Sequence, residues 1–356
     1  MNPDWQKFIE SQGGIFDVDG HARFGDLRTD IQTAQNSTII TDLSCYAQIH
    51  VQGEDMETFL QGQFTNDIRL IDENHSQLSA YCTPKGRMLA LFRIWRTADG
   101  VTHLLLPGEL QEGISKRLRI YVMRAKVTLE HAENMVQFGL TGPKASQILK
   151  SAGIEYPETV DACNTTAWGT VIAIAGPTST SCHRFLISGP THQLASLWKK
   201  CVQQGAAAVS SQVWHWMDIH AGLPSVVTAT SEAFIPQMAN LDLIQGVNFK
   251  KGCYPGQEIV ARMQYLGKLK QRMYRFSTAD ERGCKPGDTL YAHEFGEQSA
   301  GTIVEVQPAP GGGMDILAIT QIKAIEGEGI YFDSGYTQAL KLQELPYKAT
   351  LPACKM

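Results

Sequence analysis

One cysteine lies in a stretch whose residue types could make its sulfur reactive. Cys253 follows Lys250, Lys251 and a glycine, and it precedes a Pro-Gly turn and a helix-like pattern from Gln257. The N–H groups at a helix start carry partial positive charge, and lysines add to it, so both favour a thiolate. A free cysteine is also commonly a small buried hydrophobe. The stretch therefore predicts either a functional thiol or a core side chain.

A longer pattern surrounds this cysteine. Residues 251–258 read Lys-Gly-Cys-Tyr-Pro-Gly-Gln-Glu. This stretch resembles the signature Lys-Gly-Cys-Tyr-x-Gly-Gln-Glu of the YgfZ family, folate-binding tRNA-modifying proteins related to the aminomethyltransferase (T-protein) of the glycine cleavage system. Three further segments resemble the family, at residues 60–67, 84–87 and 234–241. The resemblance implies a site for tetrahydrofolate or a one-carbon derivative, with Cys253 as the functional thiol.

The resemblance also suggests which side chains would contact folate. A pterin needs aromatic faces and amide partners, and its glutamate tail needs cations. The predicted folate-binding residues are Tyr46, Trp214, Gln237, Asn240, Tyr254 and Arg262. Lys250 and Lys251 are expected to favour the thiolate. Trp214 also lies on an amphipathic pattern, so a core position is the alternative for it.

Two positions depart from the relatives. After the turn at Gly86, where the aminomethyltransferase has an aspartate, this chain has Ala90 and Leu91. Where relatives have a glutamate before Ala-Gly, this chain has His220. The missing carboxylate argues against aminomethyl transfer, since a base is needed, and we do not expect a classical enzyme. His220 changes the expected contact with the pterin edge.

Our preferred hypothesis is a folate-binding accessory protein that supports iron-sulfur cluster assembly or repair, and hence tRNA modification. A single thiolate can hold iron transiently or form a mixed disulfide. Expected partners are iron-sulfur client proteins, including tRNA-modifying enzymes. A folate-dependent aminomethyltransferase and an RNA-binding module remain alternatives, the latter through the basic residues of 116–126. Direct nucleic-acid binding is not expected.

Composition sets broad limits. The chain has 356 residues, of which 43% are hydrophobic and 19% charged, with a net charge of −5. This is ordinary globular composition, large enough for two or three domains. Residues 1–14 do not resemble a secretory signal, and no apolar run approaches the ~20 residues of a membrane span. The eight cysteines show no metal-binding spacing. We expect a cytoplasmic protein with free thiols, no resident metal and no membrane contact.

The elements that would position these residues alternate between strands and helices up to about residue 267. This pattern predicts an α+β fold with two antiparallel-sheet lobes. Short strands between glycine turns then predict a C-terminal β-barrel. The resemblance implies three lobes around a central cavity. The expected domains are residues 1–43 with 131–245, 44–130, 246–267 (signature loop and helix) and 268–345.

Several elements can be placed in more detail. Thr141 and Pro143 are expected to cap a helix that ends near Gly153, and Ser211 to cap another. A further helix is expected over residues 191–204. The predicted strands of the lobe at residues 44–130 are residues 46–51, 77–82, 88–95, 101–106 and 126–130, and those of the barrel are 272–277, 289–291, 301–306, 315–322 and 329–332.

Overall fold

The structure, a computed structural model, describes residues 1–177 and 184–348. Cys182 and Cys354, predicted to be free thiols, lie outside the described residues. The chain divides into two compact units. The first comprises Met1–Leu60, Ile68–Gln77 and Phe92–Trp214; the second comprises Gln61–Asp67, Leu78–Leu91 and His215–Met356. The four-part division expected from the sequence stays a prediction.

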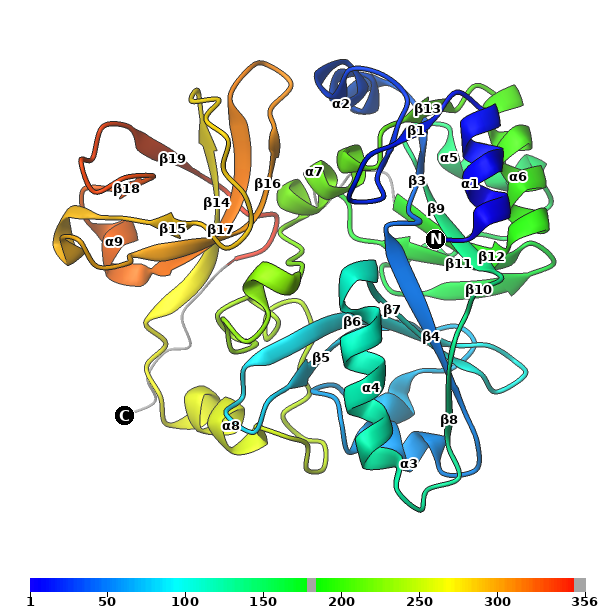
Figure 1. The fold of residues 1–356 in the computed structure, drawn as a ribbon, viewed down its shortest axis with the longest axis horizontal. Helices are drawn as coiled ribbons and strands as arrows, with labels where there is room; N and C mark the ends of the chain where they lie inside the picture. The colour runs from blue at the N-terminus through cyan, green and yellow to red at the C-terminus, as the bar shows by residue number, and fades with distance from the viewer. Residues whose placement is uncertain (178–183, 349–356) are drawn as a thin grey trace. The chain divides into compact units, whose positions relative to one another are not determined.

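The first unit contains a six-stranded sheet covered by helices (Figure 1). Its strand order is β10 (Cys163–Thr166), β11 (Gly169–Ile174), β12 (Arg184–Pro190), β9 (Met135–Thr141), β3 (Ile39–Asp42) and β13 (Ala207–Val209). Neighbours are antiparallel, except that β13 runs parallel to β3. Around this sheet lie α1 (Pro3–Ser11), α2 (Leu27–Asn36), α5 (Ala145–Ser151) and α6 (Thr191–Gln203).

The core of this sheet is aromatic. Trp5 from α1 and Trp198 from α6 meet edge to face, with ring centroids 6.0 Å apart, a favoured arrangement for aromatic pairs. Both side chains are fully buried. The Asn2 side chain caps α1 by accepting from the N–H groups of Asp4 and Trp5. The predicted helix at 191–204 is confirmed by α6, whereas α1 was not predicted.

A five-stranded sheet follows the sequence closely. Its order is β5 (Gln77–Cys82), β6 (Met88–Arg96), β7 (Thr102–Pro107), β4 (Tyr46–Gln52) and β8 (Thr128–His131). The division into units passes within β5 and β6. Helices α3 (Met56–Gln61) and α4 (Gln111–Val122) belong to the same stretch, and α4 buries Ile114 and Leu118. All five strands predicted for this lobe are confirmed.

One expected cap is wrong. The helix α5 begins at Ala145 with Lys144 at its N-cap, and no side chain caps it. Thr141 instead ends strand β9, where it pairs with Ile39 of β3. The hydrogen bonds of the sheet therefore extend farther along the chain than the capping pattern suggested, and the helix starts later.

The C-terminal part of the second unit is a six-stranded antiparallel barrel. The order is β15 (Thr289–Leu290), β16 (Gly301–Pro308), β17 (Met314–Gln321), β14 (Gln271–Thr278), β19 (Ala339–Gln343) and β18 (Ile330–Tyr331). Tyr291, just after β15, exchanges two backbone hydrogen bonds with Tyr331 of β18, which joins the two edges. The predicted barrel is confirmed, although β19 and the short α9 (Ile322–Glu326) were not predicted.

The segment between the sheets and the barrel contains the signature. Helix α7 (Gln212–Ala221) crosses the division between the units after Trp214, and α8 (Gln257–Tyr265) follows the signature loop. The long connection between these helices is held to β6, because the Met88 N–H donates to the carbonyl of Phe234 and the Glu232 N–H donates to the carbonyl of Met88. The connection therefore has a defined place in the second unit.

The remaining elements are short. They are β1 (Ile15–Phe16), β2 (Ala22–Arg23), η1 (Ile68–Leu70), η2 (Gly108–Leu110), η3 (Thr228–Thr230) and η4 (His293–Phe295). Within the described parts of the chain, no helix combines the length and the apolar character that a membrane crossing requires.

Candidate functional site

Cys253 is the exposed thiol among the described free cysteines. Cys45 and Cys284 are half-buried, and Cys82, Cys163 and Cys201 are buried. Burial raises the pKa of the Cys163 and Cys201 thiols to about 12, so both stay protonated and unreactive at neutral pH. The structure confirms that a helix begins at Gln257, four residues after Cys253.

Lys251 anchors the loop on the N-terminal side of the thiol. Its side chain is only 6% exposed, and its ammonium donates to the carbonyl oxygen of Gln61 at 2.7 Å and to that of Phe64. It also lies 5.1 Å from the centre of the Tyr254 ring. A buried ammonium is costly unless such partners surround it. The role predicted for Lys251 at the thiol stays a prediction, but its anchoring role was not foreseen.

A contact between two glycines fixes the loop on the C-terminal side. Gly256 has φ of +81°, and a Cβ there would lie 2.4 Å from the carbonyl oxygen of Thr83 and 2.5 Å from Cα of Gly86. Only glycine fits so close to another backbone. The Gln257 amide adds weak contacts at 3.4 Å to the carbonyl oxygens of Lys251 and Gly252. The turn at 84–87 and the signature loop are thus one packed structure.

Tyr254 turns inward beside the thiol. It is buried, and burial, with a smaller contribution from Cys82, raises the pKa of its phenol well above the usual value. The phenol therefore stays protonated at neutral pH. As a result, Tyr254 acts as a second anchor of the loop, and its predicted contact with folate remains untested.

Gln237 and Asn240 lie together in the second unit with different hydrogen-bonding states. The Gln237 side chain donates to the carbonyl of Val260 at 2.7 Å, and its buried Oε1 has no partner among the described residues. Asn240 is satisfied, because its Nδ2 donates to the carbonyl of Met273 and its Oδ1 accepts from Arg272. Of the two, Gln237 retains an acceptor for the N–H groups of a pterin edge.

The cations predicted around the site differ in environment. Arg262 is exposed and pairs with Glu258 at 2.6 Å. Lys250 is exposed, and its backbone N–H donates to Asn248 Oδ1 at 2.8 Å. The sequence did not indicate the buried pair between Arg272 and Asp242, whose N–O distance is 2.9 Å. That pair fixes the segment that carries Gln237 and Asn240.

Trp214 and Tyr46 belong to the first unit. Trp214 is 5% exposed. The Arg184 guanidinium lies 4.4 Å from its ring centre, and a Cβ on Gly139 would be 2.4 Å from Cζ3 of the ring. Tyr46 is half-buried at the start of β4, and its carbonyl accepts from the Gln137 side chain at 2.6 Å. The folate contacts predicted for both aromatics are not tested by these packing arrangements.

The residues at the two positions that differ from the relatives make their contacts within the second unit. Ala90 and Leu91 are buried in β6. The His220 Nε2 lies 2.9 Å from Asp315 Oδ2, and Arg275 lies 2.9 Å from His220 Nδ1. Although burial raises the pKa of Asp315, hydrogen bonds from His220 and Trp216 bring it below its usual value. His220 therefore links α7 to the barrel.

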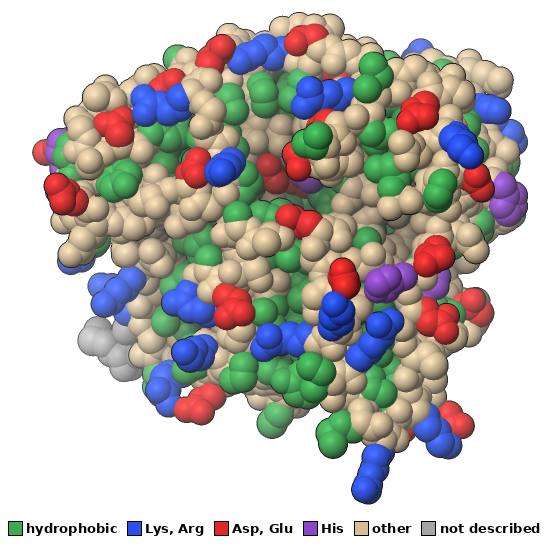
Figure 2. All heavy atoms as spheres, in the orientation of Figure 1, with side chains coloured by type: hydrophobic (Ala, Val, Ile, Leu, Met, Phe, Trp, Pro, Cys, Tyr) green, Lys and Arg blue, Asp and Glu red, His purple; other side chains and the backbone are tan. Residues whose placement is uncertain are grey.

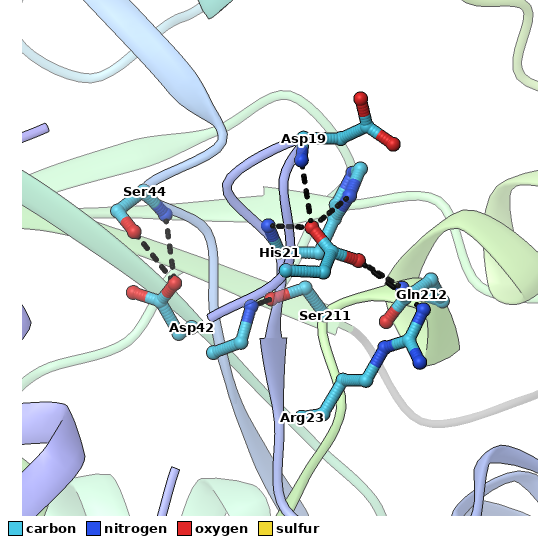
Figure 3. A network of polar contacts seen from close by, with 9 residues as sticks. Asp19, His21, Arg23, Asp42, Ser44, Ser211 and Gln212 are labelled. Carbon is cyan, nitrogen blue, oxygen red and sulfur yellow. Dashed lines mark hydrogen bonds and ion pairs between the residues drawn. The ribbon is translucent and has the colours of Figure 1, made fainter. Parts of the chain in front are cut away.

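One group of metal-ligand types is already used internally. Asp17, Asp19 and His21 place candidate ligand atoms within 4.8 Å of one another. The Asp17 carboxylate accepts from the backbone N–H groups of Asp19 and His21 and from the Gln212 side chain, and Figure 3 labels these three donor residues. These bonds stabilise the hairpin between β1 and β2. The Asp17 carboxylate is thus engaged by the turn itself.

The basic residues of 116–126 are partly neutralised. Lys116 pairs with Glu112 and Lys126 with Glu54, each at 2.7 Å, and Arg119 donates to the carbonyl of Leu129. These contacts are typical of a solvated helix face. RNA binding by this segment stays a prediction.

Comparisons with known proteins show which family and fold this chain matches. Residues 15–250 match the family model described as the GCVT N-terminal domain. The fold is similar to that of the glycine cleavage system aminomethyltransferase T from Bartonella henselae, with a TM-score of 0.79, 17% identity and 96% coverage of each chain. Fold and sequence therefore define a protein of the GCVT class.

The more specific relatives are curated tRNA-modifying proteins. The chain is 31% identical to the tRNA-modifying protein YgfZ of Colwellia psychrerythraea over 285 residues, which cover 79% of this chain and 85% of the relative. It is 28% identical to YgfZ of Pectobacterium carotovorum over 322 residues, covering 90% and 95%. The chain belongs to the YgfZ family.

Proposed function

We propose that this protein supports tRNA modification as a folate-binding accessory factor for iron-sulfur enzymes, acting through Cys253. The observation that carries the proposal is an exposed thiol on an immobilised loop. Gly256 and the buried Lys251 fix the backbone on both sides of Cys253, whereas Cys253 itself is exposed. The relatives in this family are named as tRNA-modifying proteins.

The chemistry of a single exposed thiolate fits a transient role. It can add one ligand to iron that other residues hold, or form a mixed disulfide with a client thiol. A resident cluster needs several such ligands in one place, and the other described cysteines are at least partly buried. Cys253 would therefore deliver or protect a cluster in a client, rather than hold one permanently.

Folate binding is supported by the GCVT-type fold and by one buried hydrogen-bond acceptor that has no partner within the described chain. The buried Gln237 Oε1 has no partner within the described chain, and a reduced pterin offers N–H donors at its edge. Arg262 and Lys250 are exposed cations of the kind that a glutamate tail requires. A bound folate would supply one-carbon chemistry. This chain has Ala90 and Leu91 where the aminomethyltransferase has its aspartate, so accessory use is favoured over transfer.

Replacement of Cys253 tests the proposal. Cys253→Ala should retain the fold and tetrahydrofolate affinity, measured by quenching of tryptophan fluorescence, yet fail to restore tRNA modification in a strain that lacks this protein. Cys284→Ala, which removes a half-buried thiol of the same unit, is the matched control and should restore it. Full complementation by Cys253→Ala would exclude the role of the thiol.

A further inference from the structure

Three large apolar side chains on or just after α8 are exposed, beside the exposed Glu258 and Arg262. Val260 is buried, whereas Ile259, Tyr265 and Leu266 are exposed, Tyr265 by 67% and Leu266 by 86%. Ile259, Arg262 and Leu266 follow the i, i+3, i+7 spacing of one helix face. Large apolar side chains grouped on a surface commonly mark a binding site.

Four exposed lysines lie close to this apolar group in the chain or in the turn packed against it. Lys85, Lys250, Lys268 and Lys270 are exposed, and none makes an ion pair within the described chain. Lys85 precedes Gly86, and a Cβ on Gly86 would lie 3.1 Å from Ile259, so this lysine borders the helix. Figure 2 shows Lys and Arg side chains next to hydrophobic ones over α8. We call these four lysines with Ile259, Tyr265 and Leu266 the α8 surface.

The α8 surface is continuous with the thiol loop. Phe249, just before the signature, meets the Tyr265 ring with centroids 6.3 Å apart. The contact between Gly256 and Gly86 fixes the start of α8 against the turn that carries Lys85. Cys253 is therefore presented next to the α8 surface by the same immobilised backbone.

The charge pattern favours a protein over a nucleic acid. Protein interfaces combine an apolar centre with a polar rim, whereas nucleic-acid interfaces are mostly polar and strongly basic. Within the helix, Glu258 neutralises Arg262 at 2.6 Å and is itself exposed. A phosphate strand crossing α8 would meet this carboxylate, while the lysines at the edge of the surface complement Asp and Glu side chains.

We propose that the α8 surface binds a protein whose contact region has an apolar centre ringed by Asp and Glu side chains, and that it brings this partner to Cys253. The inference rests on the proposed function in one respect, namely that the partner is the client of the thiol. Leu266 is the apolar anchor, and Lys268 and Lys270 follow it two and four residues further along the chain as cations of the rim.

Photo-cross-linking in cells tests the proposal. The full chain with p-benzoylphenylalanine in place of Tyr265 replaces the native copy, and adducts formed under ultraviolet light are identified by mass spectrometry. We expect an adduct with another protein at an acidic, apolar patch. Leu266→Asp, and separately Lys268→Glu with Lys270→Glu, should each lower its yield about tenfold or more.

The controls use an equally exposed apolar residue elsewhere. Met123 is also 86% exposed, but it follows α4 in the first unit, and Met123→Asp should leave the yield unchanged. The proposal is overturned by an adduct no stronger than one formed from position 123, by an adduct that ribonuclease removes, by an adduct with a second copy of this chain, or by a yield insensitive to both sets of substitutions.

The variant Cys253→Ala separates this proposal from the proposed function. It should keep the adduct, because docking does not use the sulfur. If Cys253→Ala complements fully while the adduct persists, the proposed function fails and the α8 surface stands. If the adduct is absent while Cys253 is still required for tRNA modification, the α8 surface fails alone.

Discussion

Replacing Gly256 by alanine should release the thiol loop. A side chain at φ of +81° costs about 1 kcal/mol, and overpacking adds about 1–3 kcal/mol. The clash cannot be relieved by a rotamer change, because the new Cβ meets backbone atoms of Thr83 and Gly86 at 2.4 and 2.5 Å. The free energy of loop opening should therefore fall by about 2–4 kcal/mol, which raises the open population roughly 30-fold or more.

Limited trypsin digestion measures this opening. Trypsin binds the exposed Lys250 side chain, but it can cleave the Lys250–Lys251 bond only when the loop opens, because the next residue, Lys251, is otherwise held by the Gln61 and Phe64 carbonyls. Where opening is fast, the cleavage rate follows the open population. Gly252→Ala is the matched control, since a Cβ there meets nothing within 4 Å. Equal cleavage rates in the two variants would refute the role of the glycine contact.

Other perturbations act in the first unit. Burial, with a smaller effect of His50, lowers the pKa of His103 to about 3 from 6.5. The unfolded chain therefore takes up this proton first, and about 2 kcal/mol of stability should be lost between pH 7.5 and 5. Faster hydrogen exchange in β6 and β7 would report the loss, and His103→Gln should abolish it. Burial raises the pKa of Asp42 to about 6, so its contribution is complete below pH 3.8 and disappears as the pH rises through 6. In urea titrations, Asp42→Asn should be more stable than the parent at pH 8 but not at pH 4. Gly139→Ala should displace the Trp214 ring, cost about 1–3 kcal/mol and shift tryptophan emission, whereas Gly113→Ala, with open space around it, should do neither.

The sequence predicts those parts of the fold whose signals are local. The strands predicted between residues 46 and 131 and those predicted for the barrel are short runs bounded by turn residues, and the structure confirms them. The start of α8 at Gln257 was also readable, because a Pro-Gly turn precedes it. Helix α1 was missed, since it buries only Trp5 and Ile9 and its stability depends on packing against distant elements.

The structure of the site depends on contacts between residues far apart in the chain. A lysine beside a cysteine suggests an exposed charge, yet the Lys251 ammonium is buried against carbonyls 187 and 190 residues away. Gly86 and Gly256 each follow a proline-containing turn, but nothing local indicates that the two turns touch. One packing contact therefore explains both the glycine of the signature and the glycine of the 84–87 turn. Neither segment reveals this contact by itself.

Trp214 illustrates the same limit for ligand contacts. Its spacing was compatible with either stacking on a pterin or packing in the core. In the first unit, the Arg184 guanidinium lies over its ring, and Arg184 itself is fully buried and donates to the Trp214 carbonyl at 3.3 Å. A pterin could stack on that face only if Arg184 moved, which would break buried charge-assisted hydrogen bonds. Stacking of a pterin on the face that Arg184 covers therefore requires a rearrangement of Arg184, and the ring atoms beside Gly139 leave no room even for a Cβ there.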